Sequence, residues 1–63
     1  MLQYKLKLML AIDDCVLAVY YSPKRAYQLL IIDEFNCVYD YPEIFYTQEA
    51  AEIEGIEAVK ELL

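Results

Sequence analysis

Apolar and polar residues alternate in a way that predicts the first element of this chain. Between Tyr4 and Ile12 an apolar side chain occupies every second position, which is the period of a β-strand with one buried face. Asp13-Asp14 interrupts the alternation and is short enough to form a two-residue hairpin turn. The predicted strand places five side chains on one face: Tyr4, Leu6, Leu8, Leu10 and Ile12.

The next two predicted strands, residues 15–21 and 26–32, are apolar on both faces. Strands of this composition are usually covered on both sides. Ser22-Pro23-Lys24-Arg25 joins them as a turn, because proline favours its second position. The first hairpin turn sets Cys15 opposite Ile12, so Cys15, Leu17, Val19 and Tyr21 are expected on the face of Ile12. Either Leu29 and Ile31 or Leu30 and Ile32 share that face, and the pattern leaves both registers open.

The last third of the chain predicts a short strand followed by a helix. Residues 33–36 form a turn in which Asn36 tolerates a positive φ, and residues 37–41 form the fourth strand, which Pro42 ends. After an extended linker at 43–46, Thr47 caps a helix over 48–63. Gly55 costs about 1 kcal/mol inside a helix, which is tolerable where the helix lies close to the sheet. The predicted apolar arc comprises Ala51, Ile56, Ala58, Val59, Leu62 and Leu63.

These elements predict one small α+β domain over residues 1–63, with the order ββββα. The connections are all short, so we expect a four-stranded antiparallel meander with the helix packed on one face. The opposite face then shows Val16, Ala18, Tyr20 and one apolar pair from the third strand. An uncovered apolar face of this size predicts association, either as a homodimer or in an obligate hetero-complex.

Composition strengthens the expectation of a partner. Of the 63 residues, 60% are apolar, and so short a chain buries only about 60% of the surface that it exposes when unfolded. The net charge of −6 argues against direct contact with nucleic acid or an anionic membrane, since both require basic residues. The charge is compatible with a basic protein partner. No run approaches about 20 apolar residues, and we expect a cytoplasmic protein.

The chemistry predicted from this sequence is not catalytic. The chain contains no His, and Ser22, Thr47 and Gly55 are the only residues of their types, so no nucleophile elbow or phosphate loop can be formed. The acid pairs Asp13-Asp14 and Asp33-Glu34 lack the interleaved ligands of a calcium loop and are interpreted as solvated turns. We therefore expect neither an enzyme, nor a metal site, nor a cofactor.

The two cysteines, Cys15 and Cys37, are too few for a disulfide scaffold and too far apart for a metal motif. Both lie in apolar strand patterns, which favours two buried thiols. A single bridge between adjacent strands is the alternative.

Two groups of side chains are candidates for a protein interface. Tyrosine offers a large, rigid contact surface with a polar tip, and the chain has seven. The acidic face of the predicted helix is the second group. The interface candidates are Tyr20, Tyr39, Tyr41, Phe45, Tyr46, Glu54, Glu57 and Glu61. We expect a non-enzymatic protein-interaction module that self-associates through its apolar sheet face. The alternative is an acidic inhibitor of a nucleic-acid-acting protein, using the three glutamates with the region of Asp40 and Glu43.

One resemblance fits the alternative. The stretch from Tyr27 to Leu63, with "IID", then "YDYPEI", then "TQEAAEIEGIEAVKELL", resembles the HicB antitoxins, in which a Pro–acid segment leads into a helix that begins with Thr. The loop that follows the Pro–acid pair in that family is absent here, as are its usual glycines. The resemblance implies an antitoxin-like, partner-binding role and assigns no function to individual residues.

Overall fold

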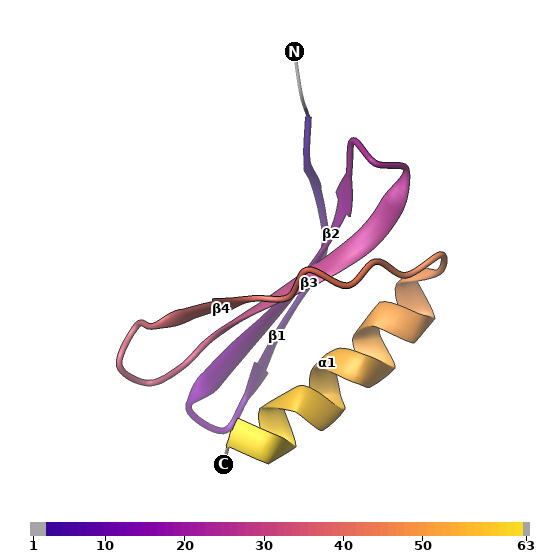
Figure 1. Ribbon diagram of the computed structural model, residues 1–63. Coiled ribbons are helices and arrows are strands. Elements are labelled where there is room, and N and C mark those ends of the chain that lie inside the picture. Colours follow the sequence, from indigo (N-terminus) through magenta and orange to yellow (C-terminus); the bar gives the residue numbers. More distant parts are fainter. Residues whose placement is uncertain (1–2, 63) are drawn as a thin grey trace.

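A computed structural model of the chain describes residues 3–62 as a four-stranded antiparallel sheet followed by a single helix (Figure 1). The strands are β1 (Lys5–Ile12), β2 (Cys15–Ser22), β3 (Ala26–Ile32) and β4 (Val38–Asp40), and the helix is α1 (Gln48–Leu62). The order of the strands in the sheet is β1-β2-β3-β4. This arrangement confirms the predicted ββββα fold of the α+β class.

The turns form where the local chemistry predicts them. Asp13 has a φ of 53° in the two-residue turn between β1 and β2, and Asn36 has a φ of 64° in the turn before β4. The amide of Arg25 donates to the carbonyl of Ser22 at 3.0 Å, which closes the turn that contains Pro23. These turns hold successive strands side by side and fix their registers.

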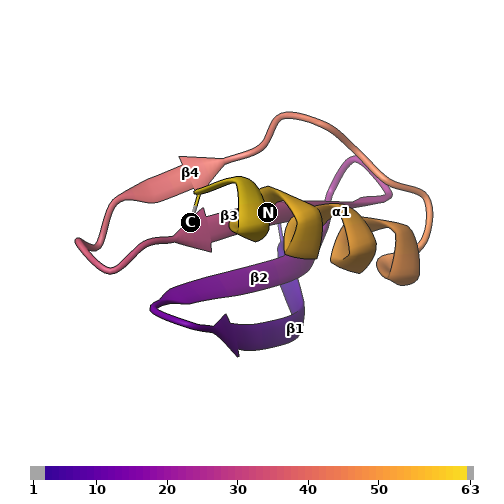
Figure 2. The same cartoon turned by 90° about the horizontal axis from the view of Figure 1, so that it is seen from below.

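The helix begins at its predicted cap and lies across one face of the sheet (Figures 1 and 2). The Ala50 amide donates to the Thr47 hydroxyl at 3.1 Å, which satisfies one of the amides left over at a helix start. Ala51, Gly55 and Val59 are buried because a spacing of four residues places them on the same side of α1. Leu63, which the sequence places on the apolar arc, lies outside the described residues.

The core lies between α1 and the central strands β2 and β3. Its buried side chains are Cys15, Leu17, Val19, Leu29, Ile31, Ala51 and Val59. Leu17 pairs with Leu10 of β1 and with Ile31 of β3, which confirms the expected shared face of the hairpin. Full burial of each Leu, Ile or Val contributes about 1.5–3 kcal/mol.

The expected face of Tyr4 and Leu6 is wrong. The ladder between β1 and β2 shifts between Leu6 and Leu8, so that Leu6 lies opposite Tyr20 while Leu8 lies opposite Val19. This β-bulge adds one residue to β1, and one extra residue moves every preceding side chain to the other face. Tyr4 consequently meets Tyr20, with ring centroids 5.7 Å apart, on the face away from α1.

The register of β3 against β2 decides which apolar pair of β3 faces away from the helix, a point that the sequence pattern left open. Leu30 lies opposite Ala18 and Ile32 lies opposite Val16, so Leu30 and Ile32 point away from the helix. No helix of residues 3–62 lies on this side of the sheet, although Ser22, Ala26 and Gln28 at one end of it are buried. We call it the open face, and its members are Tyr4, Leu6, Met9, Ala11, Val16, Ala18, Tyr20, Ser22, Ala26, Gln28, Leu30, Ile32, Val38 and Asp40.

The fourth strand is shorter than predicted, and this explains a second correction. β4 covers only Val38–Asp40, and α1 contacts β3, β2 and β1 but not β4. Cys37 therefore lies in the turn beyond the helix and is exposed, whereas Cys15 is buried. Both thiols are free, so the interpretation of two buried thiols holds for Cys15 and is wrong for Cys37.

Candidate interaction surfaces

The open face is an apolar surface of the sheet that α1 leaves uncovered. Leu6, Met9 and Val38 are 58%, 62% and 59% exposed, and Val16, Leu30 and Ile32 between them are half-buried. Ala18, which pairs with Leu30, is buried between them, and Ala26 is buried at the end of the face next to the β2–β3 turn. Contiguous apolar surface of this kind is characteristic of protein contacts.

One end of the open face carries a shallow aromatic hollow, wide open to solvent, of about 330 Å³, and it is lined by Tyr4, Tyr20, Leu30 and Asp40. The two tyrosine rings meet edge to face at an interplanar angle of 66°. The Tyr20 hydroxyl crosses β3 and donates to Oδ1 of Asp40 at 3.2 Å. Burial and then the Asp40 carboxylate raise the pKa of Tyr20, so this hydroxyl remains a neutral donor. We call this site the tyrosine hollow.

The remaining aromatic candidates do not form one surface. Tyr39 donates its hydroxyl to Oδ2 of Asp33 at 3.0 Å on the helix side of the sheet. Tyr41 and Phe45 pack partly buried against the core, and Phe45 exchanges two backbone hydrogen bonds with Tyr27, at 2.7 and 2.8 Å. Tyr46 is 82% exposed. The segment after β4 therefore mainly closes the edge of β3, and Tyr46 is its most exposed aromatic side chain.

The three helix glutamates line a groove between α1 and the segment after β4. Its volume is about 150 Å³, and its lining comprises Leu29, Tyr41, Glu43, Phe45, Glu54, Glu57, Ala58 and Glu61. Glu57 is also within 4.0 Å of Lys60. The fold brings Glu43 to the helix acids, as the alternative hypothesis expects, but it places Asp40 on the open face. We call this site the acidic groove.

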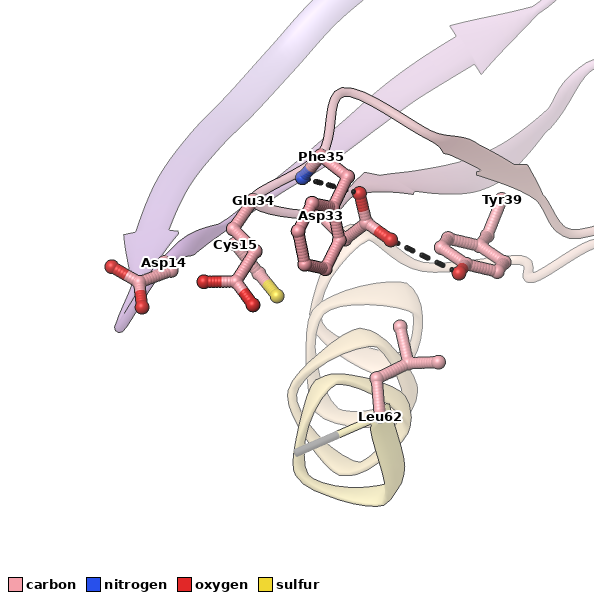
Figure 3. Close-up of a pocket in the computed structure, with 7 residues that line it drawn as sticks. All are labelled: Asp14, Cys15, Asp33, Glu34, Phe35, Tyr39 and Leu62. Atoms are coloured by element: carbon pink, nitrogen blue, oxygen red, sulfur yellow. Dashed lines mark hydrogen bonds between the residues drawn. The ribbon is translucent and has the colours of Figure 1, made fainter.

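A third hollow, of about 130 Å³, lies where the turns meet the end of α1 (Figure 3). Oδ1 of Asp33 accepts hydrogen bonds from the backbone amides of Phe35 and Cys37, each at 2.9 Å. These bonds, Cys37 first, together with the Tyr39 hydroxyl, hold the pKa of Asp33 below its ordinary value of 3.8. Asp33 therefore organises the turn before β4, where a merely solvated acid was expected.

The third hollow also contains the buried thiol of Cys15. Burial and then the nearby carboxylates, Asp33 first among them, raise the pKa of Cys15, and a thiol held neutral is a poor nucleophile. Among residues 3–62, no group of three or more His, Cys, Asp or Glu side chains is placed to hold a metal ion. Within the same residues, no helix is both long and apolar enough to cross a membrane.

Sequence reasoning named Tyr20 but missed three of the four residues of the tyrosine hollow. Tyr4 was expected on the other face, because the alternation from Tyr4 to Ile12 shows no break at the bulge. The face on which Leu30 lies could not be assigned, because the sequence pattern left the register of β3 open. Asp40 was assigned to the acidic helix surface, and only the pairing of Leu30 with Asp40 places it on the open face.

Comparison of the chain with known protein families, curated proteins and solved structures gave no match. The similarity to HicB antitoxins therefore remains a resemblance in sequence pattern.

Proposed function

We propose that this chain is a non-enzymatic protein-interaction module whose interface is the open face, and that it self-associates through that face. The observation that carries the proposal is the row of apolar side chains exposed on a face that α1 does not cover, with Leu6, Met9 and Val38 each more than half exposed. Burial of such side chains against a second apolar surface is favourable by about 25 cal/mol per Å².

The area of the open face determines how strong self-association through it is expected to be. The four strands have 8, 8, 7 and 3 residues. With about 3.3 Å per residue and about 4.8 Å between strands, they give a surface of roughly 400 Å². A stable complex buries about 800 Å² per partner, so self-association through this face alone is expected to be reversible, with a dissociation constant in the micromolar range or weaker. Such a module binds and releases its partners readily.

The test is sedimentation equilibrium of the purified chain from micromolar to millimolar concentration. We expect a monomer–dimer equilibrium in the wild type and its loss in Leu6→Glu, because a charge would be buried without a partner. Ile53→Glu is the matched control, since Ile53 is also a large aliphatic residue, is 55% exposed and lies on α1.

The controls separate this proposal from non-specific association. A monomeric wild type over the whole range would refute self-association, and equal weakening by Leu6→Glu and Ile53→Glu would show that the open face is not the interface. Circular dichroism of each variant establishes that the fold is retained.

The acidic groove supports a second candidate function, an acidic inhibitor of a nucleic-acid-acting protein with an antitoxin-like role. The supporting observation is that four glutamates from two separate segments line one groove. A basic partner held there is expected to dissociate when salt is raised, since screening weakens exposed charge contacts. Co-purification with washes at low and then high salt tests this candidate, because a partner that survives high salt excludes a mainly electrostatic contact.

A further inference from the structure

The tyrosine hollow differs chemically from the rest of the open face. Leu30 forms an aliphatic wall, Tyr4 and Tyr20 contribute aromatic rings, and Asp40 contributes a carboxylate. The edge-to-face contact of the rings and the hydrogen bond from Tyr20 to Asp40 tie three of the four lining residues together. The hollow is therefore built by contacts between β2, β4 and the residue that precedes β1.

This combination of groups favours a cation. The faces of aromatic rings carry partial negative charge and attract ammonium and guanidinium groups, and the Asp40 carboxylate adds a full negative charge. Tyr20 donates to one oxygen of that carboxylate, which orients the group and leaves its second oxygen as an acceptor. The chain's net charge of −6 draws a basic partner toward the molecule.

A second copy of the chain fits this end of the face less well than a basic protein does. Among the described residues placed on the open face, Asp40 is the only ionised side chain. Two open faces packed together would bring two such carboxylates to the interface, with no base from the residues that the registers place there; Lys7, at the bulge, has no register partner. A carboxylate that loses water without gaining a partner is costly, so a protein that supplies a base would displace the second copy.

We propose that the tyrosine hollow receives a lysine or arginine side chain of a protein that docks on the open face. The inference rests on the proposed function, since it takes the open face as the interface, and it adds the chemistry of the partner. In the bound state the alkyl stem lies on Leu30, the cationic head lies against the rings of Tyr4 and Tyr20, and Asp40 accepts its hydrogen bonds.

The test uses NMR titration of the isotope-labelled chain with tetramethylammonium chloride and with methylguanidinium chloride. Sodium chloride controls for ionic strength, and tert-butanol is a neutral probe similar in shape to the first cation. The concentration of the chain is kept below the dissociation constant for self-association measured by sedimentation, so that a second copy does not cover the hollow. We expect saturable shifts of the Tyr4 and Tyr20 ring signals with the cations, with a Kd in the millimolar range.

Matched variants test whether the cations bind in the tyrosine hollow. Asp40→Asn removes the charge of the hollow but keeps an oxygen that can accept from Tyr20, and we expect it to weaken cation binding at least threefold, consistent with loss of a charged contact. Glu49→Gln removes the same charge from an exposed position in the first turn of α1 that lines none of the three hollows, and we expect no change. Tyr4→Ala, at a 62% exposed position, is expected to weaken binding while the fold is retained.

Three outcomes would overturn the inference. These are equal binding of tert-butanol and the cations, shifts that do not saturate or are as large at Tyr46, and equal weakening by Asp40→Asn and Glu49→Gln. Failure of the proposed self-association is a separate result. A chain that is monomeric in sedimentation and still binds cations at Tyr4 and Tyr20 retains the tyrosine hollow as a site, whereas a chain that dimerises without binding them retains only the proposed interface.

Discussion

Gly55 lies directly against Leu17 of the sheet, and replacing it with alanine tests the packing of the core. An alanine Cβ at this position would lie 2.5 Å from Cδ1 and 2.7 Å from Cδ2 of Leu17. Leu17 is fully buried among core residues, so its side chain has little room to move. The helix or the leucine must therefore shift to accept one methyl group.

Two opposing contributions decide the sign of the effect. Alanine is favoured over glycine in a helix interior by about 1 kcal/mol, whereas extra atoms in a close-packed core cost about 1–3 kcal/mol. The predicted contact is 0.5 Å shorter than the 3.0 Å below which Cβ contacts are essentially unknown, so we place the cost in the upper half of that range. Gly55→Ala is then expected to destabilise the fold by about 1–2 kcal/mol.

The measurement is urea denaturation at one fixed, low protein concentration, because self-association would add to the apparent stability. Glu57→Ala and Glu57→Gly provide the reference, since Glu57 is exposed on the same helix and the difference between the two variants reports the local propensity. Leu17→Val should reduce the cost of Gly55→Ala, because it shortens the side chain that the new methyl group meets.

Two results would refute this reasoning. The first is stabilisation by Gly55→Ala equal to the difference between Glu57→Ala and Glu57→Gly, which would mean that α1 does not approach Leu17. The second is additivity of Gly55→Ala and Leu17→Val within about 0.3–0.5 kcal/mol, the behaviour of independent sites.

Three further predictions follow from local contacts. Thr47→Ala should cost about 1 kcal/mol of unfolding free energy, whereas Thr47→Asp, which keeps a capping oxygen, should cost little in the same urea titration. Because the pKa of Asp33 is lowered in the folded chain, its carboxylate stabilises the fold above its ordinary pKa, and this contribution disappears as pH falls through the lowered value. Asp33→Asn should therefore reduce stability at neutral pH and flatten the acid limb of the stability profile; an unchanged limb would contradict it. A maleimide should label exposed Cys37 quickly and buried Cys15 only on unfolding, as mass spectrometry of timed samples would show.

The elements of this fold could be predicted from the sequence because their boundaries depend on local chemistry. Pro23 and Asn36 determine turns through their own backbone preferences, and the Thr47 side chain caps the helix that follows it. Gly55 indicated a close approach of helix and sheet, and its neighbour Leu17 confirms it. Each of these predictions needed only residues that are near one another in the chain.

The site could not be predicted in the same way because it depends on pairing between strands. The bulge between Leu6 and Leu8 leaves the apolar alternation unbroken, and it moves Tyr4 from the expected core face to the tyrosine hollow. Asp40 joins the hollow through its pairing with Leu30. Tyr20 was named because tyrosine is common at interfaces, but its neighbours became visible only with the register of the sheet.

The most direct test of the central claim is an NMR measurement of contacts between copies, made on a mixture of isotope-labelled and unlabelled chain at millimolar concentration. The proposed interface predicts intermolecular contacts from the methyl groups of Met9, Leu30 and Ile32 on the open face. Contacts confined to the exposed helix residue Ile53, or no intermolecular contacts in a sample that sediments as a dimer at the same concentration, would contradict it.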